Sequence, residues 1–142
     1  MDDRLSAEII ADGVHVDPLM VELFLRAKRS DSAVLVTDAT AAMGMPDGQY
    51  RLGSLVVEVK DGRCLSHGKL AGSVLTMDRA VRNVVQFARC SLQDAVRLAT
   101  VNPARATGFG GAGALAEGAI ADLVVLNQQG EVVQTIVEGR VA

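Results

Sequence analysis

The feature that most constrains the fold is a short apolar run that ends in a carboxylate. The stretch Ala33-Val34-Leu35-Val36 is continuously apolar, and Thr37-Asp38 follows it directly. Such a run is typical of a strand buried on both faces, as in a parallel sheet covered by helices. Ligands of these sheets bind at the carboxyl ends of the strands, so Asp38 occupies a position suited to a reacting group. On these residues alone, a structural role as a cap or turn residue fits Asp38 equally well.

A second run of the same kind lies upstream. Residues 7–15 begin apolar and end in Asp12-Gly13-Val14-His15, and Asp17-Pro18 then marks a helix start, with the carboxylate as cap and proline in the first turn. A strand, a helix and a strand in this order form a parallel pair with a right-handed crossover. We therefore expect the two strands to bring His15 and Asp38 to one edge of the sheet.

The helix after Pro18 is expected to be amphipathic and to cover the sheet, ending at Ser30-Asp31-Ser32. Its predicted buried face comprises Leu19, Met20, Leu23, Phe24 and Ala27.

The middle of the chain changes from helical to alternating patterns. The segment from Tyr50 to Leu65 alternates and breaks at Asp61-Gly62, which predicts a β-hairpin inserted after the second strand. Apolar residues then repeat every three or four positions over 77–89, which predicts an amphipathic helix with Thr76 as its cap.

The last third begins with helices and ends with strands. Ser91-Leu92-Gln93-Asp94 resembles a capping box, and Asn102-Pro103 predicts a short helical turn that ends at Gly108. A linker rich in glycine and alanine follows. Residues 121–126 and 131–137 are then expected to form two strands joined by a turn at Gln129-Gly130.

Composition excludes several classes of protein. The chain has 142 residues, 49% of them apolar, and a net charge of -3, which fits one folded domain. Its Lys and Arg residues form no basic stripe, so no nucleic-acid partner is expected, and no apolar run approaches the ~18 residues of a membrane span. Cys64 and Cys90 lack the spacing of a disulfide scaffold or a zinc site, which favours a reducing, cytoplasmic location.

Five motifs in one order carry a resemblance to a known family. The chain resembles the C-terminal part of the N-acetylglucosamine-6-phosphate deacetylases, which belong to the amidohydrolase superfamily. The first three motifs are the more specific, because the last two are shared widely across the superfamily. The motifs are Ile9-Ile10-Ala11-Asp12-Gly13-Val14-His15-Val16, Leu35-Val36-Thr37-Asp38-Ala39-Thr40, Leu70-Ala71-Gly72-Ser73-Val74-Leu75-Thr76-Met77, Asn102-Pro103-Ala104-Arg105-Ala106 and Ala121-Asp122-Leu123-Val124-Val125-Leu126.

The resemblance implies an α/β fold that is one portion of a larger architecture. Residues 1–108 would form the last two strand-helix units of a (β/α)8 TIM-like barrel, with the β-hairpin insertion at about 50–65. Residues 109–142 would supply the C-terminal strands of a small β-sandwich.

The resemblance also implies an activity. Family members hydrolyse N-acetylglucosamine 6-phosphate to glucosamine 6-phosphate and acetate, with a divalent metal of the zinc or iron type polarising the attacking water. Asp38 matches the catalytic acid/base. Two stretches match substrate-binding positions, although a core histidine and an ordinary glycine loop are the structural alternatives: Asp12, Gly13, Val14 and His15, and Leu70, Ala71 and Gly72.

The sequence departs from the family in its metal ligands. Its two histidines, His15 and His67, form no His-x-His pair, and a solvent-exposed loop position is expected for His67. We assign no metal ligand and expect no metal bound and no turnover by this chain alone. Activity would require a missing N-terminal half or a homo-oligomer partner. The alternatives are a non-catalytic remnant or interaction module, or a fragment of another amidohydrolase.

Overall fold

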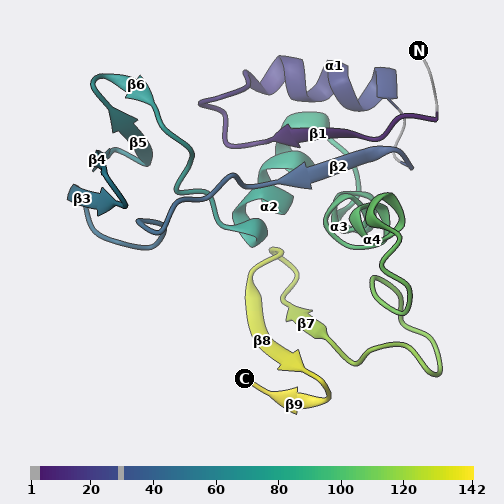
Figure 1. Cartoon of the computed structure of the whole chain (residues 1–142). Coiled ribbons are helices and arrows are strands. Elements are labelled where there is room, and N and C mark those ends of the chain that lie inside the picture. The colour runs from purple at the N-terminus through teal and green to yellow at the C-terminus, as the bar shows by residue number, and fades with distance from the viewer. Residues whose placement is uncertain (1–3, 29–30) are drawn as a thin grey trace.

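The computed structural model describes residues 4–28 and 31–142 and has an α/β architecture (Figure 1). Strands β1 (Ala7–Ile10) and β2 (Ala33–Val36) form a parallel pair in which Ala7 lies opposite Ala33 and Ile10 opposite Val36. Helix α1 (Pro18–Lys28) connects them, so the predicted strand-helix-strand unit is confirmed. The first strand is shorter than expected, because the chain turns after Ile10 instead of continuing to residue 15.

Helix α1 starts where the sequence predicts but buries a different face. The side chain of Asp17 accepts a hydrogen bond from the Leu19 amide at 2.9 Å. Val21 is fully buried, whereas Leu19, Met20 and Leu23 are 68%, 51% and 52% exposed. Ala27 is exposed too, so the predicted buried face is wrong for all its members except the half-buried Phe24. Apolar residues cover a wide arc of this helix, and packing against α2 (Met77–Ala88) and the rest of the core selects the part of the arc that contains Val21.

The core lies between β2 and the helices that follow the insertion. Helices α2 (Met77–Ala88), α3 (Leu92–Ala99) and α4 (Val101–Thr107) confirm the three predicted helices. Ser91 caps α3, since its hydroxyl accepts the Asp94 amide at 3.1 Å, whereas Thr76 makes no side-chain capping bond to α2. Helix α4 ends at a left-handed Gly108, as predicted. The core residues include Ile9, Val21, Leu35, Leu75, Val81, Val84, Ala95 and Leu98.

The insertion is larger than the predicted hairpin. Four antiparallel strands pair in sequential order: β3 (Gly48–Leu52), β4 (Leu55–Lys60), β5 (Arg63–Ser66) and β6 (Lys69–Leu70). The turn at Asp61-Gly62 is confirmed, with both residues at positive φ. The range of about 50–65 is therefore too short, because two further turns were not recognised. In Figure 1 this sheet lies beyond the arrowhead ends of β1 and β2.

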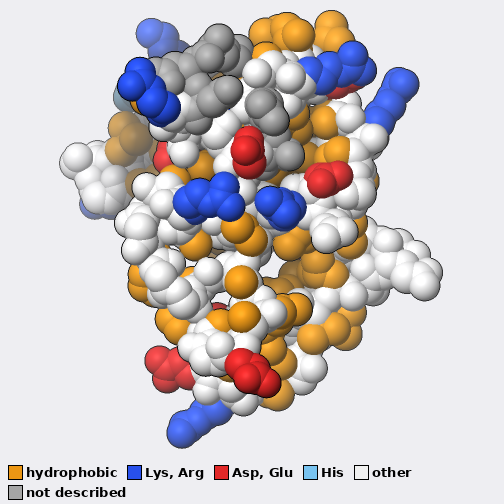
Figure 2. Space-filling view, turned by 90° about the vertical axis from the view of Figure 1, so that its right-hand side faces the viewer, with side chains coloured by type: hydrophobic (Ala, Val, Ile, Leu, Met, Phe, Trp, Pro, Cys, Tyr) orange, Lys and Arg blue, Asp and Glu red, His pale blue; other side chains and the backbone are white. Residues whose placement is uncertain are grey.

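The C-terminal region forms a third sheet. Residues 108–122 carry no helix or strand, and β7 (Leu123–Leu126), β8 (Val132–Val137) and β9 (Arg140–Val141) then pair antiparallel. The two predicted strands are confirmed and β9 is additional. Figure 2 shows hydrophobic side chains at the surface over the lower half of the view, where the linker and this sheet lie. The exposed apolar residues of this region include Leu115, Val124, Val133 and Val141.

The longest of the described helices, α2, has 12 residues. Within residues 4–28 and 31–142, none of them is both long and apolar enough to cross a bilayer.

Candidate functional site

Asp38 lies just beyond the carboxyl end of β2. It is two residues past Val36 and solvent-exposed, and its backbone adopts a left-handed conformation with a φ of 48°. This conformation is uncommon for residues other than glycine, although aspartate tolerates it better than most. A carboxylate exposed at this strand end can reach a ligand.

The segment after β6 holds the backbone of Asp38 in place. The amide of Ser73 donates to the Asp38 carbonyl oxygen at 2.8 Å, and the Thr40 amide donates to the Ser73 carbonyl oxygen at 2.9 Å. The Ser73 hydroxyl donates to the carbonyl oxygen of Thr37. Gly72 lies so close that a Cβ there would stand 3.0 Å from the Asp38 carbonyl oxygen and 2.7 Å from the Thr40 methyl group. The loop after β2 and the segment after β6 thus form one hydrogen-bonded unit.

His15 and Asp12 form the second part of the site. The Asp12 carboxylate accepts the amides of Val14 and His15, each at 2.8 Å, and its other oxygen lies 2.7 Å from Nδ1 of the His15 ring. An ionised carboxylate can only accept, so the proton of this bond belongs to Nδ1. Nε2 is then the ring atom that can meet a ligand, since the side chain of His15 keeps 19% of its exposure.

The surroundings of Asp12 favour its ionised form. Burial alone would raise the pKa of this carboxyl, but hydrogen bonds from the His15 ring and from two backbone amides outweigh it. The net result is a pKa below the ordinary value of 3.8. Asp12 therefore stays charged near neutral pH and acts as a fixed acceptor for the ring.

The register of the sheet places these two parts at the same edge. Ile10 lies opposite Val36, and the Asp12–His15 turn and Asp38 follow these two residues. The expected parallel pair is therefore confirmed, and both segments follow the carboxyl ends of its strands, whereas a common site formed by His15 and Asp38 remains a prediction.

The other predicted residues occupy defined positions. Gly13 has a φ of 74°, and a Cβ there would stand 3.3 Å from the ring of Phe87. Val14 is half-buried, whereas Leu70 ends β6 with 42% exposure. His67 lies exposed in the turn before β6, as expected. Contacts of Gly13, Val14 and Leu70 with a substrate remain predictions.

Two residues that support the site were not singled out from the sequence. Ser73 is 3% exposed, and Asn83 donates from its side chain to the Ala11 carbonyl oxygen at 2.8 Å, next to the Asp12 turn. A serine after a glycine and an asparagine on a helix are common residues. What distinguishes them is their hydrogen-bond partners, since Ser73 pairs with Thr37, 36 positions away, and Asn83 with Ala11, 72 positions away.

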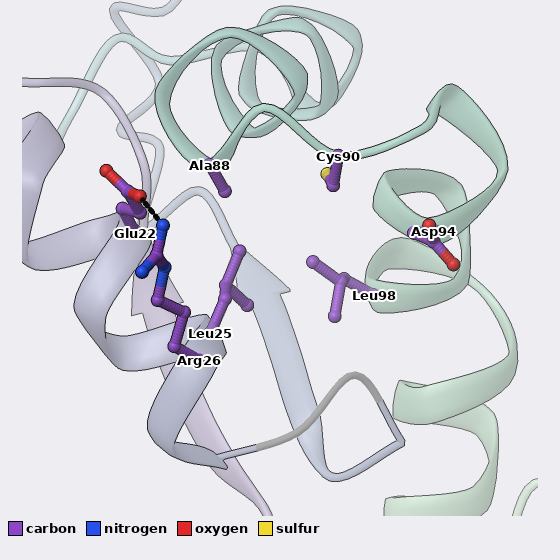
Figure 3. A pocket seen from close by; sticks show the side chains of 7 residues that line it. All are labelled: Glu22, Leu25, Arg26, Ala88, Cys90, Asp94 and Leu98. Atoms are coloured by element: carbon purple, nitrogen blue, oxygen red, sulfur yellow. Dashed lines mark hydrogen bonds and ion pairs between the residues drawn. The ribbon is translucent and has the colours of Figure 1, made fainter.

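A separate cavity of about 260 Å³ lies between α1, α2 and α3. Figure 3 shows Leu25, Leu98 and Cys90 turned toward it, with the Glu22–Arg26 ion pair at one side. Burial, followed by the negative charge of Asp94, raises the pKa of the Cys90 thiol. The thiolate, which is the reactive form, is therefore less readily formed here than in a free cysteine.

The described residues do not fit the metal that the family resemblance implies. Within residues 4–28 and 31–142, no three histidine, cysteine, aspartate or glutamate side chains gather closely enough to hold an ion. Asp12 is already engaged by His15 and by two amides.

Comparisons with known proteins agree with the resemblance. The profile described as "Amidohydrolase family" matches residues 2–142. The N-acetylglucosamine-6-phosphate deacetylase of Lysinibacillus sphaericus is 42% identical over 140 residues, which are 98% of this chain and 36% of that protein. A putative N-acetylgalactosamine-6-phosphate deacetylase of Escherichia coli K12 is 38% identical over 99% of this chain and 85% of its own length.

A solved structure is also similar. It is a mutant N-acetyl-D-glucosamine-6-phosphate deacetylase from Mycobacterium smegmatis in complex with N-acetyl-D-glucosamine-6-phosphate. The TM-score is 0.92 and the identity 41%, over 99% of this chain and 38% of that one. The chain thus spans little more than a third of most of the proteins named here.

Proposed function

The chain belongs to the amidohydrolase family, and from this membership we propose that it supplies the acid/base residue of a deacetylase for N-acetylated hexosamine 6-phosphates. The observation that carries the proposal is the position of Asp38, an exposed carboxylate held just past the end of a parallel strand. N-acetylglucosamine 6-phosphate is the first candidate substrate, and its galactosamine counterpart is the second.

Asp38 performs the proton transfers that amide hydrolysis needs. Its carboxylate accepts a proton as the oxygen of water bonds to the acetamide carbon, which leaves a tetrahedral intermediate. It then returns this proton to the nitrogen as the C–N bond breaks. The products are an amine and acetate. A positioned general acid/base contributes about 10²–10⁴-fold to such a rate.

The remaining predicted residues are assigned to substrate binding. Nε2 of His15 contacts the sugar phosphate or a hydroxyl group, with the ring fixed by Asp12. The backbone of Leu70, Ala71 and Gly72 lines the acyl end of the substrate, where glycine allows a close approach.

The rest of the active site lies, in this proposal, outside these 142 residues. The metal ligands and the other strands of a closed barrel would come from a further segment like those of the longer relatives, or from a partner chain. Residues 1–108 would be the last part of the barrel and residues 109–142 part of a sandwich. The exposed apolar side chains of β7–β9 support this arrangement, because such surfaces are usually covered. A cytoplasmic location remains a prediction from the sequence.

A chimera tests the proposal. This chain replaces the matching 36% of the Lysinibacillus sphaericus deacetylase, and acetate release from N-acetylglucosamine 6-phosphate and N-acetylgalactosamine 6-phosphate is measured. We expect turnover of at least one sugar, no turnover by the 142-residue chain alone, and a loss of about 10²–10⁴-fold in kcat for Asp38→Asn with KM nearly unchanged.

The outcomes separate the alternatives. A folded, metal-loaded chimera without activity would favour a non-catalytic remnant or interaction module. Full activity in Asp38→Asn would remove Asp38 from the acid/base role.

A further inference from the structure

We propose that Ser73 is a positioning residue for Asp38, and that its hydroxyl keeps the carboxylate in the orientation that proton transfer requires. The inference rests on the proposed role of Asp38 in deacetylation. It adds a residue that neither the sequence motifs nor the comparisons assign.

The backbone of Asp38 needs support from outside its own loop. A φ of 48° is unfavourable for a non-glycine residue and persists only where the surrounding structure enforces it. Ser73 meets this requirement, because its amide donates to the Asp38 carbonyl oxygen at 2.8 Å and its carbonyl oxygen accepts the Thr40 amide at 2.9 Å. These two bonds, the backbone bridge, fix the two peptide planes that follow Asp38, Asp38–Ala39 and Ala39–Thr40. The plane before Asp38 contains the Thr37 carbonyl group, which accepts the Ser73 hydroxyl.

The hydroxyl of Ser73 joins this backbone bridge to the end of β2 and to the residues before α2. It donates to the Thr37 carbonyl oxygen and accepts the Leu75 amide at 3.1 Å. Ser73 is 3% exposed and Leu75 4%, so neither bond is readily replaced by water. Alanine at position 73 would keep the backbone bridge and lose both side-chain bonds.

Close packing of Gly72 limits the alternatives. A Cβ there would meet the Thr40 methyl group at 2.7 Å and the Asp38 carbonyl oxygen at 3.0 Å. The segment therefore lies against Asp38 and Thr40 with no room for a side chain at position 72, so a displacement of Ser73 is expected to move the Asp38 backbone.

Ser73→Ala tests the proposal with two independent measurements. In the 142-residue chain, hydrogen exchange followed by NMR should show lower protection of the Leu75 amide, which loses its acceptor. The Thr40 amide should lose about tenfold in protection, because the hydroxyl stabilises the bridge by roughly the net value of one hydrogen bond. In the active chimera, kcat should fall about 10–100-fold while KM stays within about twofold, as expected when a reacting group is misplaced.

Ser66→Ala is the matched control. Its hydroxyl donates to the Val56 carbonyl oxygen at 3.0 Å, so the variant removes a serine-to-backbone bond of the same kind from the insertion sheet. It should leave kcat and the protection of Thr40 unchanged.

Each outcome decides one claim. Unchanged Thr40 protection in Ser73→Ala overturns the proposal, and so does unchanged kcat where Thr40 protection falls. If the wild-type chimera releases no acetate, the proposed function fails on that result alone, and hydrogen exchange still decides whether Ser73 holds Asp38. If Ser73→Ala does not fold, Ser73→Cys is measured in the same two ways, because a thiol of similar shape is a weaker donor and acceptor than the hydroxyl. Smaller losses in the same direction are then expected, and unchanged Thr40 protection with unchanged kcat overturns the proposal.

Discussion

Replacing Asp12 with asparagine tests how the ring of His15 is held. The Asp12 carboxylate accepts three hydrogen bonds, two from amides at 2.8 Å and one from Nδ1 at 2.7 Å. Asparagine keeps an oxygen for the amides but presents an NH₂ group to the ring. The charge-assisted bond is lost, and the ring proton must move to Nε2. Hydrogen bonds to charged groups contribute about 1.5–3 kcal/mol, so the free energy of unfolding should fall by about this amount at neutral pH.

The pH dependence of this loss has a defined sign. The folded-state pKa of Asp12 lies below the ordinary 3.8, so its contribution to stability is fully present above pH 3.8 and is lost as the pH falls through the folded-state pKa. The difference between wild type and Asp12→Asn should therefore be largest above pH 3.8 and shrink at more acidic pH.

Urea unfolding followed by far-UV circular dichroism measures the free energy, and ¹H–¹⁵N correlations of the His15 ring identify the protonated nitrogen. Asp122→Asn is the control, because Asp122 accepts one amide at 2.7 Å and an asparagine oxygen preserves that bond. We expect a change below about 0.5 kcal/mol for the control. If Asp12→Asn leaves both stability and ring tautomer unchanged, the carboxylate does not hold His15 and the interpretation of this turn is wrong.

Two further predictions concern packing. Gly72→Ala should destabilise the chain by about 1–3 kcal/mol, because the added Cβ meets close neighbours and the φ is positive. Gly68→Ala should cost less, because Gly68 has a similar φ but faces open space among the described residues. The same unfolding assay compares the two variants. Leu35→Ala should lower the free energy of unfolding by about 2–5 kcal/mol, because Leu35 is 2% exposed. Leu23→Ala, on the outer face of α1, should change it by less than about 0.5 kcal/mol. Equal losses would contradict the observed orientation of the helix.

Sequence patterns were most informative where one local signal determines the structure. The run from Ala33 to Val36 has no polar residue to expose, and it forms a strand that is almost entirely buried. Asp61-Gly62 favours a tight turn whatever surrounds it, and Ser91 caps α3 through a contact three residues away. Each of these predictions depends on neighbours in the sequence, and each is confirmed.

Predictions failed where tertiary packing chooses between equivalent local options. The apolar arc of α1 is wide enough for two orientations, and packing against α2 and the core buries Val21 instead of Leu23. The additional turns at Gly53 and Gly68 and the strand after Gly139 are preceded by short, weakly patterned segments. Ser73 could not be assigned because its partner, Thr37, lies 36 positions earlier.

The residues that hold Asp38 lie within this chain, whereas the segments that would complete the proposed active site lie outside it. The backbone of Asp38 is fixed by Gly72 and Ser73, both within this chain, so Asp38 can adopt its conformation without any further segment. In the described residues the parallel sheet has only two strands, and sheets this small are marginal without further strands or packing. Additional segments should therefore increase the stability of the sheet considerably and change the local geometry of Asp38 little. Hydrogen exchange of the Thr40 amide, compared between the 142-residue chain and the chimera, tests this expectation. A large increase in protection in the chimera would show that the local geometry of Asp38 depends on the additional segments.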